Sequence, residues 1–465
     1  MNSDLRPLTP EPCSAASDPS APIISVSGLR GVVGQSLTPE IALRYVCAFA
    51  QPLPPGPIVV TRDGRATGPW LADVIRGGLA AAGRDVLDAG VAATPTTGVL
   101  VRQYGAAGGV QISASHNPPE YNGLKLFAGS GQIISADEGA EVIRRYRAAE
   151  VRWAAHDRIG RVEPCADTTS RHLELVLAVI DAQAIRHRRF QIVLDANHGS
   201  GSVLGRRLLE AFDCQLTVSG GQPDGLFEHP PEPTAENLSG VARQATAAGA
   251  DVVFCQDPDA DRLAIIDERG RYLGEEYTLA ICVDHLLRRA PGPIVTNCST
   301  SRMSEDLAGR YGVPFYRSAV GEANVVEVMQ QHQAALGGEG NGGVIHPLVG
   351  LVRDSFVGMA MVLDAMAARG LTVGQLADEL PRYEIVKTKI SLPPDRVTAG
   401  LEALARHFHD AATDRLDGLR LDWPGRWLLV RASNTEPIVR AIAEAPTAAE
   451  AQRLCDEAGA VLSGS

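Results

Sequence analysis

Residues 252–262 read Val-Val-Phe-Cys-Gln-Asp-Pro-Asp-Ala-Asp-Arg, so that an apolar run passes directly into a loop with three carboxylates. Similar apolar runs lead into polar loops at 58–60, 192–194 and 294–295. Stretches with the spacing of amphipathic helices follow such runs at 70–82, 204–212 and 277–287. Because short β-branched runs alternate with helical stretches, the pattern predicts α/β units built on parallel or mixed sheets.

The repeated unit predicts three related α/β domains, at 21–165, 166–271 and 272–385. After Pro381 the pattern changes, and we expect a separate α+β domain over 386–465. Its expected elements are strands at 385–390 and 427–431 and helices at 397–412 and 448–462. Residues 1–20 are rich in proline and serine and are expected to form a disordered tail.

The composition is that of a globular protein with several domains. The chain has 465 residues, of which 45% are hydrophobic and 21% are charged. No apolar run approaches the roughly 20 residues that a membrane-spanning helix needs, and the N-terminus lacks the basic and apolar regions of a signal peptide. The eight cysteines are scattered without a Cys-x-x-Cys pair. This pattern predicts reduced thiols, a cytoplasmic location and no membrane partner.

The net charge of −12 argues against nucleic acid as a partner, because a phosphate backbone favours a basic surface. A phosphorylated small molecule is compatible with this charge, since a few local arginines suffice to bind it. The overall charge therefore does not describe the ligand pocket itself.

The carboxylates of Asp257, Asp259 and Asp261 alternate along their loop. In an extended segment this spacing turns all three to one side, where they suit a cation that prefers oxygen ligands. A solvated acidic turn is the alternative. An EF-hand is excluded because Arg262 stands at the sixth position, where the sharp turn needs glycine, and because the flanks resemble strands. A phosphatase with an aspartate nucleophile stays open at this point.

Residues 111–118 read Gln-Ile-Ser-Ala-Ser-His-Asn-Pro and place a hydroxyl on a tight polar turn after another apolar run. Ligands gather at the carboxyl ends of strands in open α/β sheets, so Ser115 is a candidate phosphate carrier, with His116 and Lys125 nearby. Ser113 is a competing hydroxyl, and a turn with a capping serine is the alternative. No Gly-x-Ser-x-Gly elbow is present, which weakens an α/β-hydrolase interpretation. Together with a carboxylate cage for Mg²⁺ and flanking arginines, this hydroxyl indicates phosphoryl transfer.

Two further loops carry polar side chains suited to a ligand. Residues 337–343 read Gly-Gly-Glu-Gly-Asn-Gly-Gly, in which Glu339 and Asn341 suit sugar hydroxyls, with a flexible connector as the alternative. No Lys-Ser or Lys-Thr follows, so this loop is not a nucleotide P-loop. Residues 431–437 read Arg-Ala-Ser-Asn-Thr-Glu-Pro and predict an anion-binding turn, with a plain turn as the alternative. Its candidate ligands are Arg431, Ser433, Asn434 and Thr435, with Arg440 nearby.

In this order the motifs resemble the α-D-phosphohexomutase family, from about residue 23 to the C-terminus. The resemblance implies a heart-shaped molecule of four domains, with one motif from each domain around a central cleft. It implies that Ser115 carries the transferable phosphate and that Asp257, Asp259 and Asp261 hold Mg²⁺ together with it. Lys125 is the candidate general acid or base, and flanking cations are expected to lower its pKa. The other catalytic residues that the resemblance implies are Arg30, His116 and Arg262.

The implied reaction moves phosphate between O6 and O1 of a hexose. A phosphoserine enzyme and a bisphosphorylated sugar are the intermediates, and hexose 1,6-bisphosphate is the activator. By the same resemblance, Glu339 and Asn341 lie in the sugar-recognition loop. The substrate's own phosphate is bound by Arg431, Ser433, Asn434, Thr435 and Arg440.

One departure from the family concerns the sugar loop. Many members carry Ser-Gly-His where this chain has Asn341-Gly342-Gly343. His346 is the nearest replacement for that histidine, although a core or surface histidine is the simpler interpretation. Together with Ser-Asn-Thr-Glu-Pro in the last motif, this loop resembles the archaeal-type phosphoglucosamine mutase branch.

The resemblance therefore favours glucosamine phosphate as the substrate over the mannose and glucose phosphates of a phosphomannomutase/phosphoglucomutase. Two other classes stay open: a Mg²⁺-dependent sugar-phosphate phosphatase and a non-catalytic sugar-phosphate-binding protein. We expect the chain to be a monomer or a homodimer.

Overall fold

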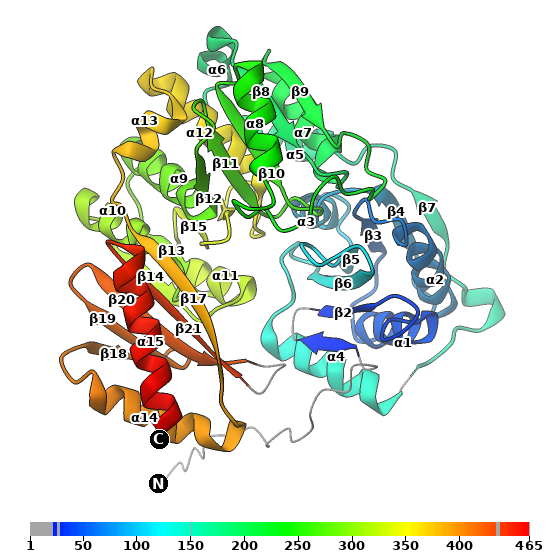
Figure 1. Ribbon diagram of the computed structural model, residues 1–465. Helices are drawn as coiled ribbons and strands as arrows, with labels where there is room; N and C mark the ends of the chain where they lie inside the picture. The colour runs from blue at the N-terminus through cyan, green and yellow to red at the C-terminus, as the bar shows by residue number, and fades with distance from the viewer. Residues whose placement is uncertain (1–21, 26–27, 150, 434–437, 465) are drawn as a thin grey trace.

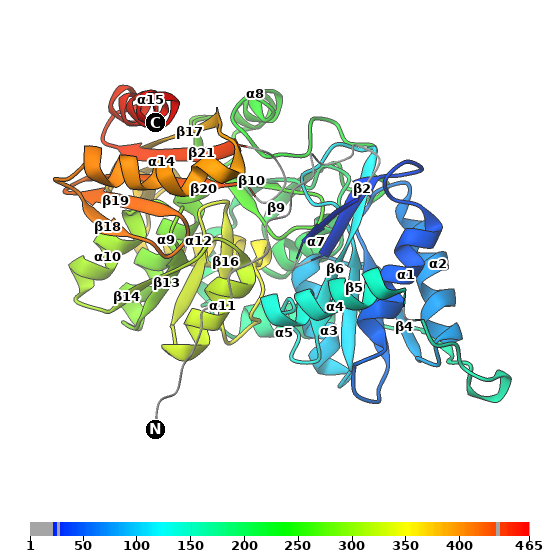
Figure 2. The same cartoon turned by 90° about the horizontal axis from the view of Figure 1, so that it is seen from below.

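The computed structural model describes residues 22–25, 28–149, 151–433 and 438–464. Four β-sheets follow one another along the chain, and the first and fourth units lie at opposite sides of the molecule (Figures 1 and 2). The expected fold class, three α/β units followed by an α+β unit, is confirmed. The predicted tail at 1–20 lies outside the described residues, as do Asn434 and Thr435.

The first unit contains a seven-stranded sheet. Its strands are β1 (Ile23–Ser25), β2 (Gly28–Val32), β3 (Ile58–Arg62), β4 (Val86–Val91), β5 (Gly108–Ile112), β6 (Tyr121–Ala128) and β7 (Val162–Pro164). Its helices are α1 (Pro39–Ala50), α2 (Gly68–Ala81), α3 (Thr94–Gln103), α4 (Ala136–Ala148) and the short η1 (His156–Arg158). The order is β1-β2-β6-β5-β3-β4-β7, parallel from β5 to β7 and antiparallel from β1 to β5. Helix α1 begins where the Thr38 side chain accepts the Ile41 amide, with Pro39 at the first helical position.

The second unit contains a five-stranded sheet in the order β12-β11-β10-β8-β9. These strands are β8 (Gln191–Asp195), β9 (Gln215–Ser219), β10 (Val252–Gln256), β11 (Leu263–Asp267) and β12 (Tyr272–Gly274). The helices are α5 (Ser170–Leu177), α6 (Ala182–Arg188), α7 (Gly201–Ala211) and α8 (Ser239–Ala248). Strand β11 returns antiparallel to β10, so the acid-rich loop joins two neighbouring strands and the expected strand flanks are confirmed.

The third unit contains a four-stranded sheet in the order β14-β13-β15-β16. These strands are β13 (Ile294–Asn297), β14 (Phe315–Ser318), β15 (Leu336–Glu339) and β16 (Gly343–Ile345). The helices are α9 (Glu275–Arg289), α10 (Met303–Tyr311), α11 (Glu322–Gln331), α12 (Ser355–Arg369) and α13 (Val373–Asp378). Because β16 runs antiparallel to β15, the glycine-rich loop is the tight turn between them. Asp354 caps the start of helix α12, because its carboxylate accepts the amides of Phe356 and Val357.

The fourth unit contains an antiparallel sheet in the order β17-β21-β20-β19-β18. These strands are β17 (Glu384–Ser391), β18 (Ala412–Asp414), β19 (Leu419–Trp423), β20 (Arg426–Ala432) and β21 (Ile438–Ala445), and the helices are α14 (Pro394–His407) and α15 (Ala448–Gly464). The helix expected at 397–412 is wrong at its end. It stops at His407, because Phe408 packs into the core and the strand that begins at Ala412 pairs with β19.

Buried contacts join the first three units. The second and third units share one apolar core, to which Phe254 and Phe356 both belong. A polar contact adds the first unit: Oγ1 of Thr96 lies 2.9 Å from Nδ1 of His172, and Nε2 of His172 lies 2.7 Å from Oδ2 of Asp354. All three of these side chains are buried. The contact therefore links one helix end from each of the three α/β units.

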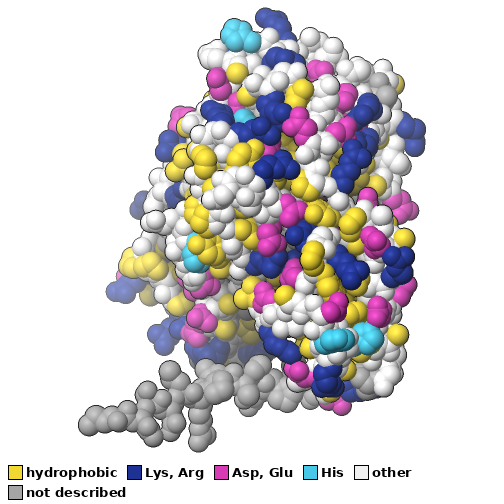
Figure 3. Space-filling view, turned by 90° about the vertical axis from the view of Figure 1, so that its left-hand side faces the viewer, with side chains coloured by type: hydrophobic (Ala, Val, Ile, Leu, Met, Phe, Trp, Pro, Cys, Tyr) yellow, Lys and Arg dark blue, Asp and Glu magenta, His cyan; other side chains and the backbone are white. Residues whose placement is uncertain are grey.

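The surface carries charges of both signs. On the face shown in Figure 3, lysine and arginine side chains alternate with aspartate and glutamate across the described residues. Among the helices that the structure describes, none has the length and apolar character needed to cross a bilayer.

Candidate active site

Ser115 lies on the loop between β5 and β6 and has an unusual backbone conformation. Its φ is 50°, in the left-handed region that few residues other than glycine adopt. The Ser113 hydroxyl accepts the Ser115 amide at 2.8 Å and donates to Oδ2 of Asp63 at 2.7 Å. Ser113 therefore supports the backbone of this turn, and Ser115 stays the candidate phosphate carrier.

Arg65, which sequence reasoning missed, donates hydrogen bonds to the backbone of the same loop. Its side chain is 1% exposed, and its Nε donates to Oδ2 of Asp63 at 3.2 Å. A guanidinium offers several N–H donors in a rigid fork and can therefore satisfy several carbonyls at once. The loop carbonyls that accept from Arg65 belong to Ser115, Asn117, Pro118 and Tyr121.

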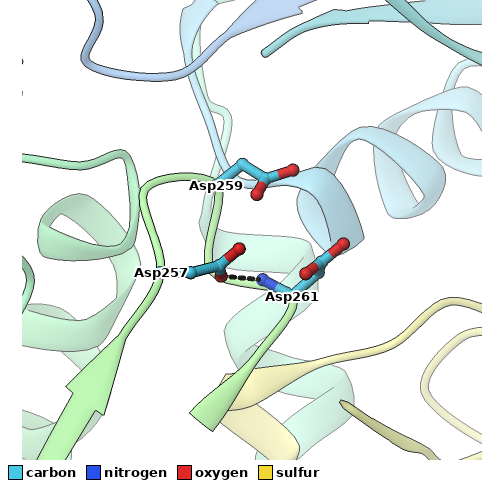
Figure 4. A group of neighbouring side chains, drawn as sticks. All are labelled: Asp257, Asp259 and Asp261. Carbon is cyan, nitrogen blue, oxygen red and sulfur yellow. Dashed lines mark hydrogen bonds between the residues drawn. The ribbon is translucent and has the colours of Figure 1, made fainter. Parts of the chain in front are cut away.

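Asp257, Asp259 and Asp261 lie on the turn between β10 and β11 (Figure 4). All three side chains are buried, and one oxygen from each lies within 4.8 Å of the others. The alternation of acids predicts an extended loop, and this prediction is wrong. The loop turns at Ala260, whose φ is 55°, and Oδ1 of Asp257 accepts the amides of Asp261 and Arg262, each at 3.1 Å. The carboxylates converge because of this turn. We refer to residues 257–262 as the metal loop.

The serine and the metal loop meet directly. Oγ of Ser115 donates to Oδ2 of Asp257 at 2.6 Å. Thr94, at the start of α3, adds a second link between the two units, because its amide donates to the Asp259 carbonyl at 2.9 Å and its hydroxyl donates to the Asp259 carboxylate. Two contacts thus bring the serine loop of the first unit to the acids of the second.

Lys125 on β6 faces the same carboxylates. Its Nζ donates to Oδ2 of Asp259 at 2.5 Å and to Oδ2 of Asp261 at 2.6 Å. Burial acts to lower the pKa of Lys125, but the two carboxylates outweigh burial and raise this pKa above its usual value. The nearby Arg353 lowers this pKa as expected of a flanking cation, but the two carboxylates set the net direction, and the lysine is a protonated ammonium between anions.

The carboxylates fit a divalent cation. Oδ1 of Asp259 and Oδ1 of Asp261 are buried and accept no hydrogen bond from the described residues. Burial raises the pKa of Asp257, and its two acidic neighbours raise it further, as expected for acids that repel one another. Mg²⁺ prefers carboxylate and other oxygen ligands. The three aspartates, with the Ser115 oxygen beside them, therefore form a candidate Mg²⁺ site.

Three more predicted residues surround the serine and the metal loop. Nη1 of Arg30 donates to Oδ1 of Asn117 at 3.3 Å, and burial lowers the pKa of this guanidinium. Nε of Arg262 lies 4.0 Å from Oδ1 of Asp261. Burial, together with the charges of Arg262 and Arg30, lowers the pKa of His116 to about 2. His116 is therefore neutral near pH 7, so it is not an imidazolium acid there.

Glu339 and Asn341 lie at the turn between β15 and β16, which we call the sugar loop (residues 337–343). Glu339 is 5% exposed, and its Oε1 accepts from Nδ2 of Asn297 at 2.7 Å and from the Gly321 amide at 3.2 Å. Its Oε2 accepts from Nη1 of Arg353 at 2.7 Å and from Nδ2 of Asn341 at 3.4 Å. Four donors therefore hold this carboxylate in one orientation.

Arg353, also missed by sequence reasoning, joins the sugar loop to the metal loop. Its Nη2 donates to Oδ2 of Asp261 at 2.6 Å, while its Nη1 bonds Glu339. Glu322, at the start of α11, contacts the same arginine twice: Oε1 accepts the Arg353 amide at 2.7 Å, and Oε2 lies 3.3 Å from Nε. Two of the predicted loops are thus connected by one buried side chain.

His346 lies in the turn after β16. It is 4% exposed, and its Nδ1 accepts the Leu348 amide at 3.3 Å. Burial lowers its pKa. These contacts agree with the simpler interpretation of His346 as a buried structural histidine.

Arg431 and Arg440 lie opposite each other on β20 and β21, where these strands enter and leave the predicted anion-binding turn. Lys389 on β17 pairs with Arg440 from the other side. Directly opposite residues of antiparallel strands share a face, so three basic side chains stand in one row. The Ser433 amide donates to the Ile438 carbonyl at 2.9 Å at the base of the turn. A row of like charges favours an anion nearby.

Asp417 links this phosphate loop (residues 431–437) to the third unit. Nε of Arg431 donates to Oδ1 of Asp417 at 3.1 Å, and Oδ2 of Asp417 accepts the Val320 amide at 3.0 Å. Val320 precedes Gly321, whose amide donates to Glu339. A series of contacts therefore runs from the phosphate loop to the sugar loop.

Family models match the chain in four consecutive segments. Those described as phosphoglucomutase/phosphomannomutase alpha/beta/alpha domains I, II and III match residues 23–152, 170–270 and 275–383, and the C-terminal domain model matches 396–460. A phosphoglucomutase/phosphomannomutase from Thermococcus kodakarensis is 36% identical to this chain, over 91% of this chain and 95% of its own. A probable phosphoglucosamine mutase from Pyrococcus abyssi is 32% identical, over 93% and 96%.

The solved structures agree with the sequence comparison. The crystal structure of a phosphoglucomutase/phosphomannomutase family protein from Burkholderia thailandensis has a TM-score of 0.83 at 28% identity, and the match covers 95% of this chain and 98% of that one. Four matched domains on one chain define a phosphohexomutase, an enzyme of the isomerase class. The chain belongs to the phosphoglucomutase/phosphomannomutase family.

Proposed function

We propose that this enzyme is a phosphoglucosamine mutase, which interconverts glucosamine 6-phosphate and glucosamine 1-phosphate. The observation that carries the proposal is the 2.6 Å contact between Oγ of Ser115 and Oδ2 of Asp257, because it brings a hydroxyl into a group of buried carboxylates. The names of several relatives support the choice of sugar, among them the probable phosphoglucosamine mutase of Pyrococcus abyssi.

In the proposed reaction the phosphate on Ser115 passes to a sugar hydroxyl. The bond from Oγ to phosphorus breaks, and a bond from phosphorus to the sugar oxygen forms. The resulting hexose 1,6-bisphosphate reorients, and its other phosphate returns to Oγ, so that the serine ends as it began. Asp257, Asp259 and Asp261, together with the phosphoserine, would hold Mg²⁺, which when bound would stabilise the charge of the transferring group.

The side chains around Ser115 supply charge and a proton carrier. Lys125 starts as an ammonium and donates a proton at Nζ to the oxygen that leaves phosphorus. As the resulting amine it takes the proton of the attacking hydroxyl, so that it ends protonated. The guanidinium groups of Arg30 and Arg262 offset the charge of the phosphate. His116, neutral near pH 7, serves as a hydrogen-bond partner in this scheme rather than as an acid.

The substrate is proposed to lie between the sugar loop and the phosphate loop. Glu339 and Asn341 accept sugar hydroxyls. The phosphate that is not transferred is bound by Arg431, Arg440 and Lys389, the basic row on the fourth sheet. Ser433, Asn434 and Thr435 complete this binding site in the proposal.

A phosphomannomutase/phosphoglucomutase is the second candidate. It is favoured by the Thermococcus kodakarensis relative, which carries that name at 36% identity. Membership of a mutase family sets aside the two other classes considered from the sequence, the sugar-phosphate phosphatase and the non-catalytic binding protein.

A substrate panel tests the proposal. The purified enzyme is assayed with the 1-phosphates of glucosamine, N-acetylglucosamine, mannose and glucose, with Mg²⁺ and a trace of the matching bisphosphate. We expect the highest kcat/KM with glucosamine 1-phosphate and no turnover by the Ser115→Ala variant. Rapid turnover of mannose or glucose phosphate, with none of glucosamine phosphate, would overturn the choice of sugar.

We also propose that the enzyme acts in the cytoplasm as a monomer or a homodimer. Every residue assigned to the site comes from a single chain, so the proposed chemistry needs no second copy. Within the described part of the chain the seven cysteines are free thiols, which suits a reducing compartment.

A further inference from the structure

The guanidinium of Arg353 contacts two loops that belong to different sheets. Nη2 bonds Asp261 of the metal loop at 2.6 Å, and Nη1 bonds Glu339 of the sugar loop at 2.7 Å. The two nitrogens belong to one rigid planar group, so they fix the spacing of the two carboxylates. The arginine is 8% exposed, so water screens these contacts little.

The base of the Arg353 side chain is also fixed. Its amide donates to Glu322, and the next residue, Asp354, caps helix α12 and contacts His172. A Cβ at Gly343 of the sugar loop would lie 2.3 Å from Cδ of Arg353, so the glycine leaves room for this stem and little more. The glycine therefore keeps the Arg353 stem next to the sugar loop, while the contacts of Glu322 and Asp354 hold the base of the side chain.

The charges around Arg353 make its two contacts depend on what is bound at either loop. One guanidinium is shared among Asp261, Glu339 and Glu322. A divalent cation at Asp261 takes up part of the negative charge there and repels the guanidinium, which strengthens the hold of Arg353 on Glu339. Conversely, a sugar bound at Glu339 fixes the position of Arg353 and hence of Asp261.

The same series of contacts continues beyond the sugar loop. Glu339 accepts the Gly321 amide, the adjacent Val320 amide donates to Asp417, and Asp417 pairs with Arg431 of the phosphate loop. A shift of Glu339 can therefore change the position of Arg431, where the substrate's phosphate is proposed to bind.

We propose that Arg353 is a positioning residue that couples binding at the metal loop to binding at the sugar loop. The inference rests on the proposed function for the identity of the two ligands. By thermodynamic linkage, Mg²⁺ tightens the binding of the hexose phosphate by the same factor by which the hexose phosphate tightens the binding of Mg²⁺.

Calorimetry on the dephosphorylated enzyme, which cannot turn over, measures this factor. Mg²⁺ is titrated into the full chain with and without a saturating concentration of the hexose phosphate that the substrate panel selects. For the wild type we expect the hexose phosphate to lower the Kd of Mg²⁺ at least about fivefold. For Arg353→Lys, which keeps the charge but loses the fork, we expect the two Kd values to agree within about twofold.

Arg76→Lys is the matched control. Arg76 also bonds two carboxylates through its two terminal nitrogens, those of Asp88 and Asp73, but it lies on the first unit away from both loops. This variant should keep the wild-type factor. Direct attraction between Mg²⁺ and the substrate's phosphate is the same in all three proteins, so it does not explain a loss confined to Arg353→Lys.

A second variant covers the case in which Arg353→Lys does not fold. Gly343→Ala keeps the arginine but displaces its stem, and it should also reduce the factor. The proposal is overturned if the wild type shows no coupling, or if a folded Arg353→Lys or Gly343→Ala variant keeps the wild-type factor. Failure of the proposed function is a separate result, recognised when the wild type turns over none of the four sugar phosphates.

Discussion

Oγ of Ser115 donates to Oδ2 of Asp257 at 2.6 Å, although 142 residues separate the two in the sequence. The serine belongs to a loop of the first sheet and the aspartate to a loop of the second. The proposed phosphoryl site therefore exists only while these two units are packed together. The proposed chemistry therefore depends on the packing of the first unit against the second as much as on the serine and aspartate motifs.

Alanine at Ser115 removes the proposed phosphate carrier. We expect mutase turnover to fall by about 10⁴-fold or more. Wild-type protein purified from cells should carry about 80 Da of extra mass on a fraction of molecules, from one phosphate, and Ser115→Ala should not. Ser113→Ala is the control: it loses a support of the turn, so it should be slower but keep the extra mass. Extra mass that persists in Ser115→Ala would contradict the assignment.

Removal of divalent cations should stop turnover, and added Mg²⁺ should restore it. Because Mg²⁺ binds the folded protein, it should also stabilise it, by about 2.7 kcal/mol at a concentration 100 times its Kd. Thermal unfolding followed by fluorescence measures this shift without any substrate. Asp259→Asn replaces one of the two metal-loop carboxylates that have a buried oxygen without a hydrogen bond from the described residues, so the shift should shrink or vanish. An unchanged shift in Asp259→Asn would place the cation elsewhere.

Alanine at Arg440 should weaken binding of the substrate's phosphate more than it slows the chemistry. The residue stands between Lys389 and Arg431 in the basic row and does not contact the serine in the proposed scheme. A lost charge-assisted contact to phosphate is worth about 1.5–3 kcal/mol, which corresponds to a KM about 10- to 150-fold higher. Steady-state kinetics give KM and kcat separately. Arg453→Ala, on the exposed face of α15, is the control, and a fall in kcat alone would argue against this role.

Glu276 makes the stability of the third unit depend on pH. Its carboxylate lies against Gly340 of the sugar loop and accepts the Ser301 amide at 3.0 Å, and burial raises its pKa to about 8. The unfolded chain has a value of about 4.3, so the folded protein holds this proton more tightly. The resulting stabilisation is complete below the unfolded value and is lost as the pH rises through about 8.

Glutamine at position 276 keeps the neutral shape and cannot lose a proton. The melting temperature of the wild type should therefore fall, relative to that of Glu276→Gln, as the pH rises from about 5 to about 9. Thermal unfolding in buffers across this range measures the difference. Two melting curves that shift in parallel across the range would show that Glu276 does not bind its proton more tightly in the folded protein.

Most of the strands were predictable because an apolar run is a local signal. Strand β10 begins at Val252 and β8 spans the run at 192–194, as the pattern indicates. The end of α14 was not predictable in this way, since Phe408 continues the helical spacing and only its packing into the core shows that the helix has ended.

The kind of chemistry at the site was predictable from the sequence, but the arrangement of its side chains in space was not. The residue types of Ser115 and the three aspartates indicate phosphate and a cation, whereas their convergence depends on a left-handed residue at Ala260 that no spacing rule reveals. The pKa of Lys125 moved in the opposite direction from the prediction, because its partners come from the second unit.

Arg353 could not be found from the sequence at all. Its partner Asp261 lies 92 residues away, and the contact forms only when the second and third units pack together. Arg65 left a local clue, since it follows Asp63 in a polar loop after an apolar strand. Its four carbonyl partners, however, come from another loop of the same sheet.

The buried link from Thr96 through His172 to Asp354 has a consequence for synthesis on the ribosome. His172 emerges 182 residues before Asp354, which takes about 10–40 s at 5–20 residues per second. During that time His172 of the second unit lacks its partner Asp354, so helix α5, which carries His172, should stay open to proteases until the third unit is made. Ribosome-bound chains that stop before residue 354 should be cut near residues 170–177, and chains that extend past residue 380 should resist; equal cutting of both would show that α5 packs without the third unit.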